Sequence, residues 1–251
     1  MSKWSVKMHG EEVPVSHSVG LAEEHVRAAL EHQMFLDWVE RMGSSTDYRV
    51  NSIDIQSIDM FGPNVGFIKF KADVRDREGG FVPGVVFMRG GAVTVLVILE
   101  CEGEEHVILT VQPRVPIGSF CFPELPAGML GGSGNFEGTA ARELKEETGI
   151  AIDASELVDL TAAVYKDHYR GVYPSAGGCD EFIRIFLYKK EVTKEELLSF
   201  QGKLTGELHE GEKITLNLVP LAELPMHTPD MKALSAVCLL NTLKCWELST
   251  Q

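Results

Sequence analysis

The sequence has no cluster of basic residues and no long apolar run. Its 251 residues carry 23 Lys and Arg against 37 Asp and Glu, a formal net charge of −14. A surface of this sign repels other polyanions, so DNA and RNA are excluded as partners. The longest apolar stretch, Ala92 to Leu99, is far too short to cross a bilayer, so we also expect no membrane partner.

The sequence also lacks cysteines and histidines at the spacing of metal ligands. The five cysteines form no CxxC pair and the eight histidines form no ligand-spaced set, which disfavours a zinc or thiol hydrolase. A nucleophilic role stays open for Cys179, in a Gly-rich segment without an evident partner base. The scattered, odd set of cysteines favours a reducing compartment. The N-terminal residues resemble neither a secretory signal nor a transit peptide, so we expect a cytoplasmic protein.

Apolar periodicity predicts a mixed α/β chain. A helical apolar stripe predicts one amphipathic helix over residues 18–42, capped by Ser18. Thr193 is the predicted cap of a short later helix, and Thr228 that of a final helix with Pro229 at its first position. Strands are expected at 53–55 and 65–74, joined by a turn at 61–64, and at 81–88, 92–100, 106–112, 157–165, 181–189 and 213–219.

These elements predict two parts. Residues 1–85 are expected to form an N-terminal extension of helix and β-hairpin, and residues 86–251 a catalytic α/β domain. The run 92–100 is apolar throughout, which is typical of a strand covered on both faces.

The segment 128–150 carries the strongest chemical signal. A helix is predicted over residues 136–148, between Asn135 as N-cap and Gly149 as left-handed C-cap. Three carboxylates of this helix share one face through their i, i+3 and i+4 spacing, those of Glu143, Glu146 and Glu147.

The simplest interpretation of this face is a solvated acidic surface with an ion pair between Arg142 and Glu146. However, the like charges of Glu143 and Glu147 cost a few tenths of a kcal/mol. Carboxylates in this arrangement suit a hard divalent cation, Mg²⁺ with Mn²⁺ as the alternative, completed by water and substrate phosphates. Such an ion neutralises a diphosphate, orients it and lowers the pKa of the attacking water.

The segment resembles the Nudix box, written G-x5-E-x7-R-E-U-x-E-E-x-G-U, where U is an aliphatic residue. Gly128 and the run from Arg142 to Ile150 match it in register. The first glutamate of the pattern falls on Gly134 instead, and the nearest acid is Glu137. The resemblance implies a pyrophosphohydrolase with a Nudix-type α/β/α sandwich built on a mixed sheet.

The resemblance also implies residue roles. Arg142 and Glu146 are the implied catalytic residues of the helix, and Arg142 acts by orienting the glutamates. The implied metal ligands are Glu143, Glu146, Glu147 and the Ala127 carbonyl.

Three further segments resemble the ADP-ribose and ADP-sugar branch of the family. LPAGM implies that Gly128 and Met129 lie at the substrate. VQPR resembles an E-Q-x-R strand end, with Val111 in place of the glutamate, and implies that Arg114 reaches the diphosphate. Arg89 in FMRGGAV resembles a second phosphate-contacting arginine. Together these arginines would supply the local positive charge that the acidic chain lacks elsewhere.

A fourth segment, YPSAGGCDE, resembles the S-P-G-G-x-x-E loop of that branch. Its acid maps to Glu181, a candidate general base that a closing loop could bring to the water. Asp180 stays open as the acting acid, and Glu181 could instead be an exposed residue at the start of a strand. The DHYRGVY insertion before the loop is longer than in bacterial ADP-ribose enzymes.

Over roughly residues 15–245 the chain resembles plant-type ADP-sugar diphosphatases. In that group the N-terminal hairpin commonly exchanges with a second subunit, and its aromatic side chains contact the adenine. The resemblance therefore implies a homodimer and makes Phe61 a candidate substrate contact, with packing inside its own turn as the alternative.

The function that we expect is Mg²⁺-dependent hydrolysis of ADP-ribose or ADP-glucose to AMP and a sugar phosphate, within nucleotide-sugar metabolism. A UDP-sugar or a dinucleoside polyphosphate is the alternative substrate. A nucleotide-sugar-binding module with weak turnover stays open; Gly134 favours it, and the intact glutamates of the helix argue against it.

Overall fold

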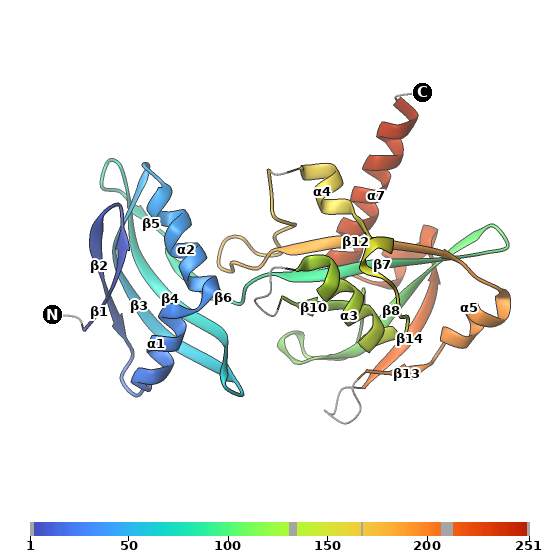
Figure 1. Cartoon of the computed structure of the whole chain (residues 1–251), viewed down its shortest axis with the longest axis horizontal. Helices are drawn as coiled ribbons and strands as arrows, with labels where there is room; N and C mark the ends of the chain where they lie inside the picture. Colours follow the sequence, from blue (N-terminus) through green and yellow to red (C-terminus); the bar gives the residue numbers. More distant parts are fainter. Residues whose placement is uncertain (1–2, 131–134, 167, 207–212, 250–251) are drawn as a thin grey trace. The chain divides into compact units, whose positions relative to one another are not determined.

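The computed structural model describes residues 3–130, 135–166, 168–206 and 213–249, and it divides the chain into two compact units (Figure 1). The first unit comprises residues 1–90 and the segment 175–181. The second comprises residues 91–174 and 182–251.

The first unit is a β-sheet with two helices packed on one face. Its elements are β1 (Trp4–Met8), β2 (Glu11–His17), α1 (Glu23–Glu31), α2 (Gln33–Ser44), β3 (Tyr48–Phe61), β4 (Asn64–Asp76), β5 (Phe81–Val82) and β6 (Val85–Met88). The sheet order is β1-β2-β3-β4-β5, and β6 also pairs with β4. β3 and β4 form the predicted hairpin, whose turn contains Gly62 with a φ of 58° that favours glycine. Ile53, Ile55 and Phe70 of this hairpin are fully buried.

Three predictions for this unit are wrong in detail. The strand expected at 81–88 is two strands, β5 and β6, which pair with β4 at separate positions. The helix expected over 18–42 is two helices, because His32 takes an extended conformation (ψ 138°) and caps the second one by accepting a hydrogen bond from the Met34 N–H. Ser18 is not a cap; its N–H continues the β2 pairing by donating to the Ile55 carbonyl. The hairpin of β1 and β2 was not predicted, although its turn at His9 and Gly10, both with positive φ, follows alternating apolar residues.

The second unit is an α/β/α sandwich around a mixed sheet, as predicted. Its strands are β7 (Ala92–Cys101), β8 (Glu104–Arg114), β9 (Ser119–Glu124), β10 (Ala127–Met129), β11 (Val158–Asp159), β12 (Ile183–Glu191), β13 (Leu204–Thr205) and β14 (Ile214–Pro220). The order is β11-β12-β7-β8-β14-β13, with β10 paired to β7 and β9 to β8. β12 and β7 are parallel, and the other pairs are antiparallel.

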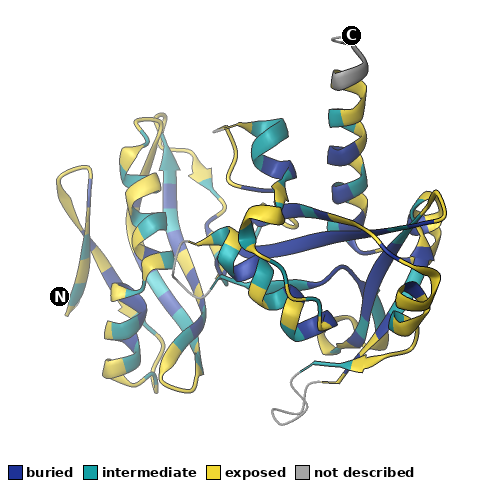
Figure 2. Ribbon diagram, turned by 45° about the vertical axis from the view of Figure 1, so that its right-hand side comes forward, coloured by how far each residue is buried: buried dark blue, intermediate teal, exposed yellow. Residues whose placement is uncertain are grey.

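Helices cover both faces of this sheet. They are α3 (Phe136–Thr148), α4 (Leu160–Tyr165), α5 (Lys194–Phe200), α6 (Leu224–His227) and α7 (Met231–Ser249), with 3₁₀ turns at Val115–Ile117, Ala154–Glu156 and Leu221–Glu223. Alternate residues of β7 face two cores, one shared with α3 and α5 and the other with α4 and α7. The prediction of a doubly covered strand is therefore confirmed, and the long central strands are dark blue in Figure 2.

Two boundaries of the second unit differ from the prediction. The strand expected at 157–165 is only the two-residue β11, after which α4 begins with Asp159 as its cap; a short apolar run does not distinguish strand from helix. The final helix begins at Met231 instead of at Pro229, and Asp230 accepts a hydrogen bond from the Lys232 N–H. In the described part of the chain, no helix has both the length and the apolar character of a membrane span.

Candidate active site

Helix α3 has the bounds expected from the sequence. The Asn135 side chain caps it by accepting from the Gly138 N–H at 2.9 Å, and Gly149 ends it in the left-handed conformation with a φ of 79°. Ala140 and Leu144 are fully buried against the sheet. This anchoring fixes the rotation of the helix, so the face with the three glutamates has a defined direction.

Glu143 rests against the backbone of the box glycine. A Cβ added to Gly128 would lie 1.9 Å from Glu143 Cδ, so only glycine leaves room for this carboxylate. Gly128 and the half-buried Met129 belong to β10, which pairs with β7. The position of Glu143 therefore explains on steric grounds why residue 128 is a glycine.

Glu147 contacts the adjoining backbone. Its side chain is buried, and Oε2 accepts a hydrogen bond from the Ala127 N–H at 3.0 Å. Its other oxygen lies 3.5 Å from Nε2 of Gln112 on β8. Two of the three glutamates therefore meet the backbone at residues 127–128, while Gln112 links the site to the neighbouring strand.

Arg142 bridges the other carboxylates. Its guanidinium donates to Glu143 Oε1 at 2.6 Å and to Glu146 Oε2 at 2.8 Å. The simple i, i+4 ion pair between Arg142 and Glu146 is therefore present, and the same side chain also holds Glu143. This geometry suits the orienting role that the resemblance implied.

Arg114 ends β8 and lies beside a buried acid. Its Nε donates to Glu124 Oε1 at 2.6 Å, and its side chain is 40% exposed whereas that of Glu124 is 4% exposed. Gln112, two residues earlier on the strand, is the residue near Glu147. The second unit thus brings Arg114 and the box glutamates onto connected elements.

Arg89 and Glu181 lie together in the first unit. Arg89 Nε is 3.4 Å from Glu181 Oε1, and the guanidinium stacks over the Phe67 ring at 5.8 Å. Asp180 accepts hydrogen bonds from the backbone N–H groups of Arg89 and Gly90. Asp180 therefore holds the backbone of this loop, while Glu181 faces the Arg89 side chain.

Phe61 and Cys179 also belong to the first unit. The Phe61 ring is half exposed, packs edge-on against Phe67 at 5.0 Å and covers Gly66, so packing inside its own turn is observed. Burial raises the pKa of the Cys179 thiol, and its sulfur accepts from the Glu181 N–H at 3.5 Å. A raised pKa disfavours the thiolate that a nucleophile requires.

Comparison with known proteins identifies the family. The model of the NUDIX domain matches residues 88–238, more than half of the chain. The chain belongs to the Nudix family. The segment from Gly128 to Ile150 is accordingly its Nudix box, and the protein is a hydrolase.

Several Nudix relatives resemble this chain. "Nudix hydrolase 14, chloroplastic" of Arabidopsis thaliana is 43% identical over 237 residues, which are 91% of this chain and 76% of the relative. "ADP-ribose pyrophosphatase" of Bacillus subtilis is 36% identical over 106 residues, 42% of this chain and 49% of the relative. A solved structure, "Crystal structure of ADP compounds hydrolase", shares the fold with a TM-score of 0.55 at 17% identity, covering 81% of this chain and 97% of the other.

The Nudix box provides donors of the right kind for a metal ion. Nudix hydrolases generally use divalent metal ions such as Mg²⁺, and carboxylates are the hard oxygen ligands that these ions prefer. Among the described residues, no three His, Cys, Asp or Glu side chains are already grouped to hold a metal. Arg142 occupies oxygens of Glu143 and Glu146, so an ion bound here would take over part of those contacts.

Three polar residues of this region were missed at the sequence level. Glu124 and Asp230 are buried and are bridged by the largely buried Lys232, and Glu124 also contacts Arg114 and stands directly before the LPAGM segment. An acid within the apolar run FCFPELP is the one signal that pointed to a buried carboxylate. The missing first glutamate of the box, at Gly134, lies outside the described residues.

Proposed function

We propose that this Nudix hydrolase cleaves the diphosphate of ADP-sugars, ADP-ribose and ADP-glucose, to AMP and a sugar phosphate with Mg²⁺. The observation that carries the proposal is the contact of Glu143 and Glu147 with the backbone at residues 127–128, next to the strand that ends in Arg114. The substrate class is supported by two relatives named for ADP-ribose, and by a mouse "ADP-sugar pyrophosphatase" that is 42% identical over 77 residues, 30% of this chain and 34% of the relative.

In this proposal the box glutamates and the Ala127 carbonyl hold the ion. When bound, the ion neutralises the diphosphate and lowers the pKa of the attacking water. Arg142 keeps Glu143 and Glu146 directed to the site through its two hydrogen bonds. Gly128 and Met129 line the substrate side of β10.

The remaining residues act on the substrate itself. Arg114 and Arg89 donate hydrogen bonds to phosphate oxygens, for which a planar guanidinium is well suited. Glu181 takes the proton from the water that attacks phosphorus. Phe61 offers an exposed aromatic face to the adenine ring.

A substrate panel tests the proposal. The release of AMP or UMP is measured from ADP-ribose, ADP-glucose, UDP-glucose and a dinucleoside polyphosphate, each with Mg²⁺, with Mn²⁺ or with EDTA. We expect AMP from the ADP-sugars only when a metal is present. Exclusive turnover of UDP-glucose or the polyphosphate would refute the substrate class, and tight calorimetric binding of ADP-ribose without product would identify a binding module.

Assembly and location are further parts of the proposal. We expect a homodimer, and light scattering that gives the mass of one chain would contradict this. We also expect a cytoplasmic protein, whereas the Arabidopsis relative carries the word "chloroplastic" in its name. Imaging of the chain with a C-terminal fluorescent tag distinguishes the two compartments.

A further inference from the structure

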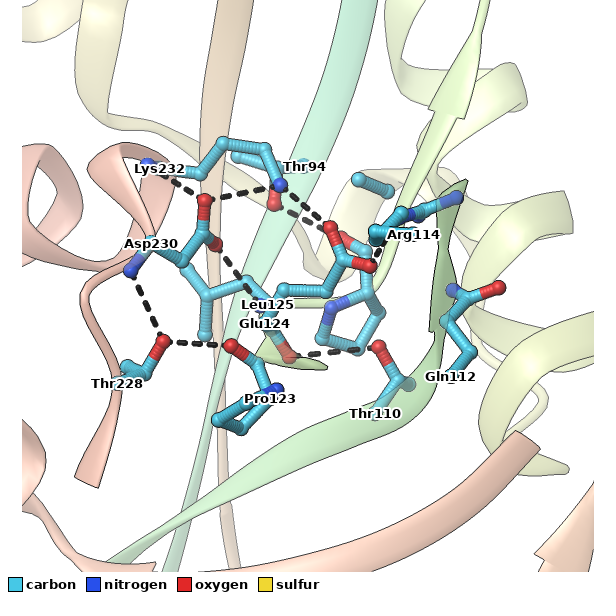
Figure 3. A network of polar contacts seen from close by, with 12 residues as sticks. Thr94, Thr110, Gln112, Arg114, Pro123, Glu124, Leu125, Thr228, Asp230 and Lys232 are labelled. Carbon is cyan, nitrogen blue, oxygen red and sulfur yellow. Dashed lines mark hydrogen bonds and ion pairs between the residues drawn. The ribbon is translucent and has the colours of Figure 1, made fainter. Parts of the chain in front are cut away.

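A chain of buried charges runs from helix α7 to Arg114 (Figure 3). The Lys232 Nζ lies between two carboxylates, 3.0 Å from Asp230 Oδ1 and 2.8 Å from Glu124 Oε2. The other oxygen of Glu124 accepts from Arg114 Nε at 2.6 Å. One carboxylate therefore connects the ammonium group of α7 with the guanidinium at the end of β8.

The first three side chains of this chain are largely buried, and only the last one, Arg114, reaches solvent to a large extent. The side chains of Glu124, Asp230 and Lys232 are 4%, 7% and 13% exposed, whereas Arg114 is 40% exposed. Glu124 contacts Arg114 through Nε, so the two terminal amino groups of the guanidinium can face an anion. The chain thus has a buried, anchored end and an open end that carries hydrogen-bond donors.

Asp230 also holds the backbone next to the box. Its Oδ2 accepts from the Leu125 N–H at 3.2 Å, and the nearby Thr228 hydroxyl donates to the Pro123 carbonyl at 2.6 Å. The residues just before α7 therefore hold the backbone on both sides of Glu124. The Glu124 carboxylate itself is held by Lys232 at one oxygen and by Arg114 at the other.

Lys232 keeps its positive charge between these two carboxylates. Burial lowers its pKa, but the attraction of Asp230 and Glu124 and the hydrogen bonds to both carboxylates outweigh burial, so the pKa lies above its ordinary value. Stability alone does not require such a network, because apolar side chains of similar volume often stabilise a fold as well as buried ion pairs do. A positioning role explains why four charged groups meet here.

We propose that Lys232 and Asp230 are positioning residues that, through Glu124, aim the Arg114 guanidinium at the substrate diphosphate. The inference rests on the proposed function in so far as a diphosphate is the ligand of Arg114. Without the Lys232 ammonium group, both Glu124 oxygens turn to Arg114, and its terminal amino groups are drawn away from the anion.

The test compares Lys232→Met with three other variants. Kinetics with ADP-ribose and calorimetry with magnesium pyrophosphate are measured for the wild type, K232M, K232R, R114M and the double variant R114M/K232M. We expect K232M to raise KM and the pyrophosphate Kd by about tenfold, with a smaller change in kcat, and K232R to restore most of the affinity. In the R114M background, K232M should add less than about twofold, because its effect passes through Arg114.

Two controls keep the result interpretable. Lys244→Met removes an exposed lysine of the same helix, which lies 3.9 Å from Glu105 Oε2, and should leave both constants unchanged. If K232M does not fold, Asp230→Asn replaces it, since the amide oxygen can still accept from the Leu125 N–H; we expect about a threefold weakening that also disappears in R114M.

The outcomes separate the two proposals. A K232M effect of equal size in the R114M background, or a wild type that binds pyrophosphate no better than R114M, overturns the positioning role. A wild type that binds pyrophosphate in an Arg114- and Lys232-dependent manner but releases no AMP from any ADP-sugar keeps the positioning role and refutes the proposed function.

Discussion

Gly128→Ala tests the geometry of the box with the smallest possible change. The new methyl group would lie 1.9 Å from Glu143 Cδ, whereas ordinary Cβ contacts begin at 3.4 Å. The backbone at Gly128 is held in β10 by its pairing with β7. The Glu143 carboxylate is therefore the group that must move, by about 1.5 Å, to restore an ordinary contact.

Such a displacement is large for a group that would hold a catalytic ion under the proposed function. A misplacement of about 1 Å costs about 100-fold in rate, which corresponds to about 2.7 kcal/mol in the activation barrier. We therefore expect G128A to lower kcat/KM for ADP-ribose by about 100-fold. Stability should change little, because Glu143 can rotate toward solvent, and thermal unfolding checks this.

Gly43→Ala is the matched control for this substitution. It makes the same chemical change in α2, where the nearest atoms to a new Cβ are 3.6 to 3.8 Å away. We expect G43A to keep full activity. A G128A variant with wild-type kcat/KM would show that the observed position of Glu143 has no part in the reaction.

Three further predictions concern single side chains. Glu147→Gln should lower kcat by about 100-fold or more, with an unchanged melting temperature, because the amide oxygen still accepts from the Ala127 N–H but the charge is lost. Cys179→Ser should keep activity within about twofold, since burial raises the pKa of the thiol; a loss above about tenfold would favour a thiol mechanism. Although burial lowers the Lys232 pKa, its carboxylate partners raise it overall above 10.5, so its stabilisation is present below pH 10.5 and is lost as the pH rises through the folded pKa. Denaturant unfolding at alkaline pH should therefore show a steeper loss for the wild type than for K232M, and parallel curves would contradict this.

Local patterns were sufficient to predict part of the structure. The bounds of α3 followed from Asn135 and Gly149, because caps act within one turn of the helix. The covered strand β7 followed from an apolar run too continuous for a one-sided sheet. The caps of α3 act inside the segment itself. The burial of β7 requires only apolar neighbours on both faces and does not depend on which residues these are.

Other features depend on contacts that are distant in sequence. The break at His32 keeps Leu30 and Phe35 both buried, so the apolar stripe looks continuous across two helices. Glu124 and Lys232 are 108 residues apart in the sequence, and the residues around each one do not indicate its partner. Composition and spacing carry no information about which buried acid meets which buried base.

The sequence led us to expect that the arginines supply the positive charge for a diphosphate, but the structure changes this expectation. Arg114 is paired with Glu124 and Arg89 with Glu181, while Arg142 is shared by two of the box glutamates. Their charge is thus already offset before an anionic substrate arrives. The arginines can still donate hydrogen bonds to the diphosphate. Under the proposed function, however, the metal ion at the box must neutralise the negative charge of the diphosphate. This argues that substrate affinity, and not only the rate of hydrolysis, depends on the metal.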